Sequence, residues 1–141
     1  MTKKNFNQQS LINVPHGALL TAVRSRDFTT VSRLIASGAD VNEIDNLRST
    51  PLIIASFNGY KQIAELLINS GADLNACDYN NNNALILSIA CNRPEITKLL
   101  LDNNANPNIC NKHGATTLNL AIITKKVKTV ELLLANNADV N

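Results

Sequence analysis

The stretch Gly38-Ala39-Asp40-Val41-Asn42 is the first of four related stretches in this chain of 141 residues. It returns, 33 residues later each time, as Gly71-Ala72-Asp73-Leu74-Asn75, Asn104-Ala105-Asn106-Pro107-Asn108 and Asn137-Ala138-Asp139-Val140-Asn141. A second marker keeps the same interval, namely Leu19, Leu52, Leu85 and Leu118, with Ala22, Ala55, Ser88 and Ala121 three residues further on. Two markers in phase over four copies indicate a stack of similar structural units.

Each unit is expected to contain two short helices joined by a tight turn. The first helix should run to about residues 24, 57, 90 and 123, after the N-cap residues Gly17, Thr50, Asn83 and Thr116. The second is expected over 28–36, 61–69, 94–102 and 127–135, before Gly38, Gly71, Asn104 and Asn137, which tolerate a left-handed backbone. The segment that follows predicts a turn or short hairpin.

Helices of about nine residues are only marginally stable alone in water, so each must bury its apolar face against neighbours. The chain is 45% hydrophobic but only 4% aromatic, which predicts a continuous aliphatic core. Small residues at Ala22, Ala55 and Ala121 allow adjacent helices to approach closely. The sequence therefore predicts a one-dimensional helical stack.

The residues of the second unit resemble the ankyrin repeat family. The resemblance rests on Ser49-Thr50-Pro51-Leu52-Ile53-Ile54-Ala55, Asn58-Gly59, Glu65-Leu66-Leu67 and Gly71-Ala72-Asp73-Leu74-Asn75. It implies an all-α ankyrin-repeat solenoid with short hairpin-like loops. We expect a polar N-terminal tail over residues 1–11 and a repeat domain over 12–141, with repeats at about 12–44, 45–77, 78–110 and 111–141.

Two features depart from the family pattern. The His that often follows Thr-Pro-Leu is replaced by Leu20, Ile53, Ile86 and Asn119. The Gly between the two helices survives only as Gly59, with Arg26, Asn92 and Lys125 at the equivalent positions. Arg26 and Lys125 should adopt a strained backbone or a different turn, so the first and fourth repeats are expected to deviate locally.

Composition excludes several classes of protein. A net charge of +2 is too small to indicate nucleic-acid or membrane binding by electrostatics alone. The longest apolar runs are far shorter than the roughly 20 residues of a membrane span, and no apolar stretch follows the basic start as in a signal peptide. An odd number of cysteines, 3, argues against a disulfide framework and favours a reducing, cytoplasmic location.

Catalytic and metal-binding motifs are weak. The chain has two histidines and no carboxylate pair on a shared segment, so no enzyme activity is expected. Cys77, Cys91, Cys110 and His113 invite comparison with a zinc site, but the Cys-x2-Cys clustering of such sites is missing. Cys77 and Cys110 lie one repeat apart, about 8–10 Å, which is too far for a disulfide. We expect three structural thiols, with no cofactor and no metal.

Two polar clusters have ordinary structural explanations. Lys125, Lys126 and Lys128 are most simply the solvated start of a helix, with a phosphate or nucleic-acid contact as the alternative. The run Asn80-Asn81-Asn82-Asn83 is most simply a hairpin tip followed by an N-cap, with a sheet-like Asn ladder as the alternative.

The ankyrin resemblance implies that a partner binds to the concave face, formed by the hairpin tips and the exposed flank of the first helices. Two of the five aromatic residues, Phe57 and Tyr79, fall on this face, although Phe57 packing between repeats is the alternative. The candidate partner-binding residues are Arg24, Asn46, Leu47, Ser49, Phe57, Asn58, Tyr79, Asn80, Asn82, Cys91, Lys112, His113, Ile123 and Thr124.

These observations favour a protein–protein interaction module without catalytic activity. The alternatives are the targeting arm of a larger enzyme whose catalytic domain lies outside this chain, and a nucleic-acid binder that uses the lysine cluster. The abundance of Asn, Lys and Ile suggests an AT-rich genome, and ankyrin proteins from such sources often resemble effectors that intracellular bacteria deliver into a host cytosol. A host scaffold, an inhibitor and a protist protein are the alternatives. The partner would be another protein, with no nucleic acid and no membrane involved.

The two ends of the array differ in polarity. The first repeat carries several polar residues among its apolar ones, as a capping repeat should, whereas the fourth keeps the apolar residues of an internal repeat. We therefore expect the chain to be a fragment of a longer protein. We also expect a monomer that self-associates weakly through its C-terminal end.

Overall fold

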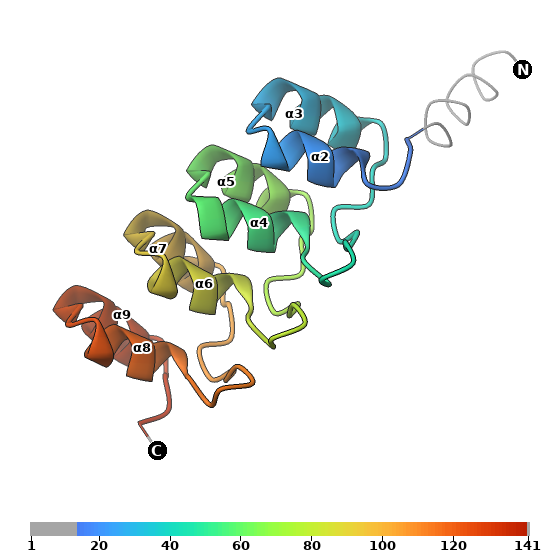
Figure 1. Cartoon of the computed structure of the whole chain (residues 1–141). Coiled ribbons are helices and arrows are strands. Elements are labelled where there is room, and N and C mark those ends of the chain that lie inside the picture. Colours follow the sequence, from blue (N-terminus) through green and yellow to red (C-terminus); the bar gives the residue numbers. More distant parts are fainter. Residues whose placement is uncertain (1–13, 141) are drawn as a thin grey trace, which may run out of the picture.

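A computed structural model describes residues 14–140 and shows four antiparallel helix pairs stepped along one axis (Figure 1). The first helices of the pairs are α2 (Ala18–Arg24), α4 (Pro51–Asn58), α6 (Ala84–Ala90) and α8 (Thr117–Ile123). The second helices are α3 (Phe28–Ala36), α5 (Lys61–Asn69), α7 (Pro94–Asp102) and α9 (Val127–Ala135). The all-α repeat solenoid is confirmed, and the first helices end within one residue of the predicted positions. The predicted tail over 1–11, the start of the first repeat at residue 12, and Asn141 lie outside the described residues.

The first helices of the last three repeats begin at the predicted N-caps. The N–H of Ile53 donates to Thr50 Oγ1 (3.2 Å), and the N–H of Ile86 donates to Asn83 Oδ1 (2.8 Å). Thr116 caps α8 in the same way. These side chains satisfy backbone donors that a helix start leaves without partners.

Helix α2 begins at Gly17, which has no side chain to serve as a cap. Its cap comes instead from Glu43, a buried carboxylate in the following loop. Glu43 Oε2 accepts from the N–H of Gly17 (2.8 Å), and Oε1 accepts from the N–H of Leu20 (2.9 Å). The same hydrogen bonds that start α2 thus tie it to the loop that leads into the second repeat.

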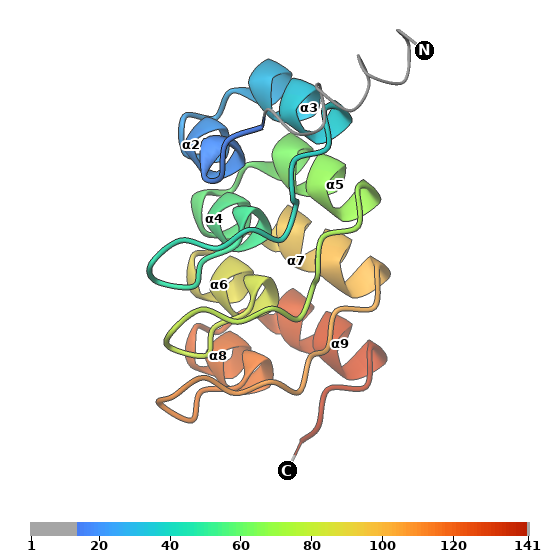
Figure 2. The same ribbon diagram turned by 90° about the vertical axis from the view of Figure 1, so that its right-hand side faces the viewer.

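The helices form two layers, one of the four first helices and one of the four second helices, with the loops between repeats lined up in a further column (Figure 2). Within each layer a helix packs on its counterparts in the adjacent repeats. The equivalent leucines of the first helices are all buried, as are Leu67, Leu100 and Leu133 on the second helices. The core is therefore the continuous aliphatic column that the sequence predicted.

Asparagine side chains join successive repeats beside this core. The side-chain oxygens of Asn42, Asn75 and Asn108 accept from the backbone N–H of Asp73 (2.8 Å), Asn106 (2.9 Å) and Asp139 (2.7 Å), respectively. Each bond spans 31 residues of sequence. The Asn at the end of each of the first three marker stretches therefore links its repeat to the next one.

The turn between the two helices has the same left-handed backbone in all four repeats. Gly59 has φ 79°, and Arg26, Asn92 and Lys125 have φ values of 54°, 57° and 57°. The strain predicted at Arg26 and Lys125 is present, but the expected deviation of repeats one and four is wrong. The packing of the flanking helices imposes one turn geometry whatever residue occupies it.

Candidate functional site

The hairpin tips between repeats are built around an acidic or amide side chain. Oδ1 of Asp45 accepts from the N–H groups of Leu47 and Ser49, at 2.8 Å each. Asp78 and Asn111 hold the next two tips in the same way. Each tip also contains one left-handed residue, as at Arg48 with φ 61°. The tips therefore have a defined shape and present their remaining side chains in register.

Neighbouring tips are also bonded to each other. The N–H of Tyr79 donates to the carbonyl of Leu47 (3.0 Å), and the N–H of Lys112 donates to the carbonyl of Asn80 (2.9 Å). The side chain of Asn111 donates to Asn82 Oδ1 (3.1 Å). The tips consequently form one continuous wall beside the first helices.

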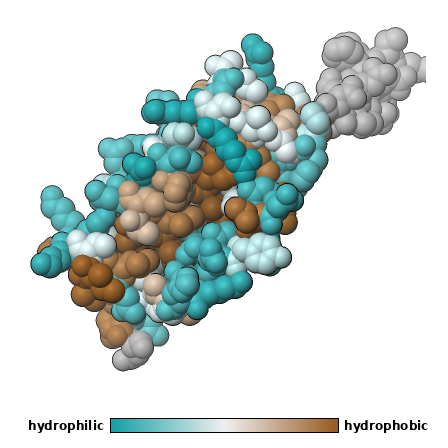
Figure 3. Space-filling model, in the orientation of Figure 1, coloured by the Kyte–Doolittle hydropathy of each residue, from teal (hydrophilic) through white to brown (hydrophobic). Residues whose placement is uncertain are grey.

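A groove of about 590 Å³ lies between this wall and helices α4 and α6. Its lining residues come from both sides and from the end of α2: Arg24, Asp45, Leu47, Ser49, Ile53, Ile54, Phe57, Asn58, Asp78, Asn80, Asn82 and Leu87. Hydrophobic side chains gather in a diagonal band over the first helices (Figure 3). The concave side of the array is therefore hollowed where apolar side chains are exposed.

The groove combines an apolar floor with a polar rim. Leu47 and Phe57 are largely exposed at its edges, although both are hydrophobic. Exposed or half-buried amide side chains of Asn80 and Asn82 stand at the rim. The charges at the groove are partly neutralised, because Arg24 forms an ion pair with Asp45. Such a surface suits a segment that inserts an apolar side chain and hydrogen-bonds through its backbone.

Half of the candidate partner-binding residues line this groove. They are Arg24, Leu47, Ser49, Phe57, Asn58, Asn80 and Asn82. Phe57 is exposed rather than packed between repeats, so the alternative placement of its ring is wrong. Cys91, Ile123 and Thr124 lie at the C-terminal ends of α6 and α8, further along the array and outside the groove lining.

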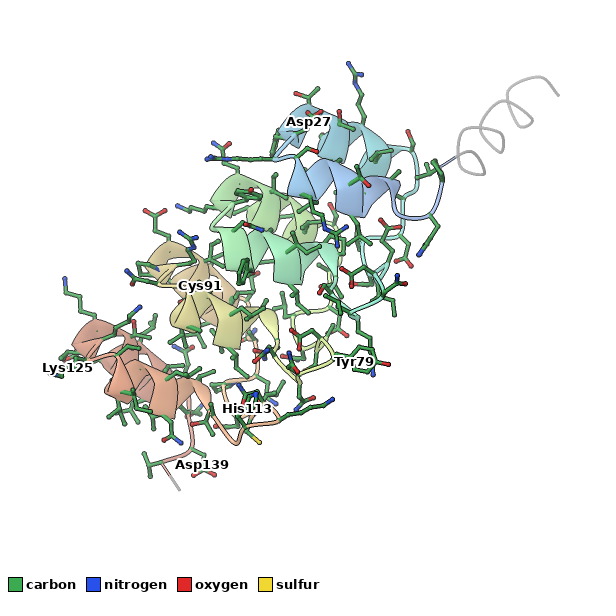
Figure 4. All side chains as sticks on the ribbon, viewed as in Figure 1. Asp27, Tyr79, Cys91, His113, Lys125 and Asp139 are labelled. Carbon is green, nitrogen blue, oxygen red and sulfur yellow. The ribbon has the colours of Figure 1, made fainter. Side chains whose placement is uncertain are left out.

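Asn46, Tyr79 and Lys112 form a separate column, because they occupy the same position in three successive tips. Tyr79 lies at a tip and points away from the helices (Figure 4). Lys112 Nζ lies over its ring, 5.3 Å from the centroid. His113, one residue further, is exposed at the same tip as Lys112. The structure thus does not bring Tyr79 and Phe57 into one hollow.

Sequence reasoning missed the acidic and aliphatic part of the groove lining. Asp45 and Asp78 occupy equivalent positions one repeat apart, and so do Ile54 and Leu87. The 33-residue interval could therefore have identified both pairs as equivalent positions in the groove lining. The capping role of Glu43 had no such signal, because its hydrogen-bond partners lie 23 and 26 residues away in sequence.

The three cysteines are free thiols in different parts of the array. Burial raises the pKa of the Cys77 thiol, and the nearby carboxylates of Asp78 and Asp73 raise it further. Within residues 14–140, no group of three or more His, Cys, Asp or Glu side chains is placed to hold a metal ion. His16 is exposed, with Nδ1 3.5 Å from Glu43 Oε2.

None of the helices in the described part of the chain is both long and apolar enough to span a bilayer. A family model described as "Ankyrin repeats (3 copies)" matches residues 3–78, 19–111 and 75–141. Together these matches span nearly the whole sequence. No curated protein matches the chain at a significant level.

Proposed function

Because this chain belongs to the ankyrin repeat family, whose repeats are generic protein–protein interaction modules, we propose that it binds a partner protein through the groove beside α4 and α6. The partner would present an extended segment with one apolar anchor side chain. That side chain would enter between Leu47 and Phe57, and the segment's backbone would bond to the asparagine rim.

The observation that carries this proposal is the exposure of two large apolar side chains at the mouth of the groove. Leu47 is 66% exposed and Phe57 is 52% exposed, and both stand beside the aliphatic floor formed by Ile54 and Leu87. Binding of an apolar side chain would remove this surface from water, at about 25 cal/mol per Å². Aromatic residues surrounded by polar groups are common energetic centres of interfaces.

We also propose that the chain has no catalytic activity of its own and acts as a monomeric scaffold in a cytoplasmic compartment. The free thiols at Cys77, Cys91 and Cys110 support a reducing environment. Delivery as an effector into a host cytosol is a narrower form of this proposal. It is supported by composition alone.

The test is quantitative binding of a partner captured by the full chain, compared between matched variants. Phe57→Ala and Leu47→Ala should each weaken binding about fivefold or more, the effect of losing about 1 kcal/mol. Lys98→Ala is the control, because Lys98 lies on α7 in an exposed ion pair with Asp102 (2.6 Å). The proposal fails if the Lys98 variant loses as much affinity as the groove variants while all three remain folded.

A further inference from the structure

The groove contains a carboxylate that the fold leaves without a counter-ion. The charged side chains among its lining residues are Arg24, Asp45 and Asp78. Arg24 forms an ion pair with Asp45, whereas Asp78 forms no ion pair in the part of the chain that the structure describes. Arg48 and Lys112 line a second hollow together with Asp78, yet neither pairs with its carboxylate. The lining of the groove therefore has more negative than positive charge.

The 33-residue interval explains why Asp78 lacks the counter-ion that Asp45 has. Arg24 and Asp45 are 21 residues apart in the sequence. Phe57 and Asp78 occupy the same two positions one repeat later. Phe57 on α4 therefore stands where the preceding repeat has Arg24 on α2. The groove has the acidic half of a second ion pair, with an exposed aromatic ring in the position of the basic half.

The Asp78 carboxylate is held in position but still has room for a further donor. Its Oδ1 accepts from the N–H groups of Asn80 (2.8 Å) and Asn82 (2.9 Å). Its Oδ2 accepts from the side-chain amide of Asn82, at 3.3 Å. In the preceding tip, the equivalent oxygen of Asp45 is the one that accepts from Arg24. Because a carboxylate oxygen can accept two hydrogen bonds, Asp78 Oδ2 can accept from a guanidinium in the same way.

The next boundary between repeats has neither the ring nor the charge. The equivalent positions there are Ala90 and Asn111. The side chain of Asn111 is neutral and donates to Asn82 Oδ1 (3.1 Å). Within the described part of the chain, an aromatic ring and a carboxylate without a counter-ion therefore occur together at the boundary of the second and third repeats alone.

We propose that Asp78 and Phe57 recognise an arginine side chain of the partner segment, a specificity that rests on the groove binding proposed above. The guanidinium pairs with Asp78 as Arg24 pairs with Asp45, and it lies against the Phe57 ring in a cation–π contact. The apolar anchor of the same segment enters beside Leu47. A lysine binds less tightly at this place, because its ammonium lacks the planar fork of donors.

The probe is a series of synthetic peptides of about ten residues, each with one Leu and one Arg at varied spacing in a Gly-Ser background. Matched peptides carry citrulline in place of Arg, which keeps the planar shape and removes the charge. Binding to the isotope-labelled full chain is measured by NMR titration, which detects weak complexes. We expect the best Arg peptide to bind about fivefold more tightly than its citrulline counterpart. It should also shift the amide signals of Asn80 and Asn82, which donate to the Asp78 carboxylate.

The decisive variant is Asp78→Asn, with Asp73→Asn as its matched control. Both changes remove one carboxylate from the same loop, and both have a precedent one repeat later. There, Asn111 and Asn106 form the equivalent turn bonds through amide oxygens. Asp78→Asn should lower the affinity for the Arg peptide to that of the citrulline peptide. Asp73→Asn should leave the preference for Arg unchanged, because Asp73 lies outside the groove lining. Phe57→Arg should remove the preference, because it supplies Asp78 with an internal counter-ion.

Arginine recognition and groove binding fail in different ways. Equal binding of the Arg and citrulline peptides, with both weakened by Leu47→Ala, would overturn the arginine site and retain the groove as the binding surface. A preference for Arg that survives Asp78→Asn, or that Asp73→Asn reduces equally, would overturn the arginine site as well. If Leu47→Ala also left the binding of every peptide unchanged, groove binding itself would be contradicted. Absence of binding by all Arg peptides would likewise overturn arginine recognition.

Discussion

The third and fourth repeats have the same helices and similar side chains, yet their apolar residues end in different surroundings. Ile89 on α6 is 1% exposed, whereas Ile122 at the same position of α8 is 55% exposed. Leu101 on α7 is buried and Leu134 on α9 is exposed. In a stacked array, the helix is determined by its own residues, but the burial of one face is determined by the next repeat.

The largest change in stability is expected when Ile89 is truncated, with Ile122 as its matched partner. Ile89→Ala should lower the free energy of unfolding by about 2–5 kcal/mol, because it opens a cavity between α6 and α8. Ile122→Ala should cost less than about 1 kcal/mol, because water already reaches that side chain. Urea unfolding of both variants measures the difference. Similar losses of unfolding free energy for the two variants would show that the next repeat does not determine the burial of this face.

The turns between helices offer a second contrast of smaller size. Gly59→Ala should destabilise the fold by about 1–2 kcal/mol, because φ is +79° and the added Cβ would lie 2.9 Å from the Arg93 side chain. Lys125→Gly in the fourth repeat should stabilise it by up to about 1 kcal/mol. The check is the shift of the urea midpoint for each variant. If both changes move the midpoint in the same direction, the shared left-handed turn is not the controlling feature.

Ser56 on α4 occupies the position that Ile89 occupies on α6, one repeat earlier in the sequence. Its side chain is fully buried, and its hydroxyl has no hydrogen-bond partner. Ser56→Ala should therefore raise the free energy of unfolding by about 1 kcal/mol, the cost of burying an unpaired hydroxyl. Thermal unfolding measures it, with Thr21→Ala on exposed surface as a control. A loss of stability on Ser56→Ala would show that the hydroxyl is satisfied in solution.

The smallest effect concerns association between molecules. The open face of the fourth repeat, with Ile122 and Leu134 exposed, should support weak self-association at high protein concentration. Sedimentation velocity over a concentration series measures it. Ile122→Ser should abolish the concentration dependence, whereas Thr21→Ser at the polar first repeat should leave it unchanged. A monomer at every concentration would contradict this expectation.

The fold could be predicted from the sequence because the same helix start and stop residues recur in every repeat. The N-caps at Thr50, Asn83 and Thr116 and the left-handed residues after the second helices lie in phase, and the structure confirms them. The sequence was insufficient where one residue acts across the chain. Glu43 caps α2 from the next loop.

The groove was predicted in part. The exposed flank of the first helices was identified through Phe57 and Asn58, but the floor residues Ile54 and Leu87 were missed because they resemble core residues in sequence. Tyr79 was assigned to the same face as Phe57, because the family resemblance places the hairpin tips and the exposed flank of the first helices together on the concave face. Its direction depends on the tip geometry set by Asp78, which composition does not reveal.

Side chains of the first three repeats thus form the groove. The most direct test of the central claim is site-specific photo-cross-linking, with p-benzoylphenylalanine placed at position 57 in the groove or at position 98 on α7. We predict that a bound partner protein cross-links from position 57 and not from position 98. Cross-linking from position 98 alone would contradict a concave groove as the binding surface.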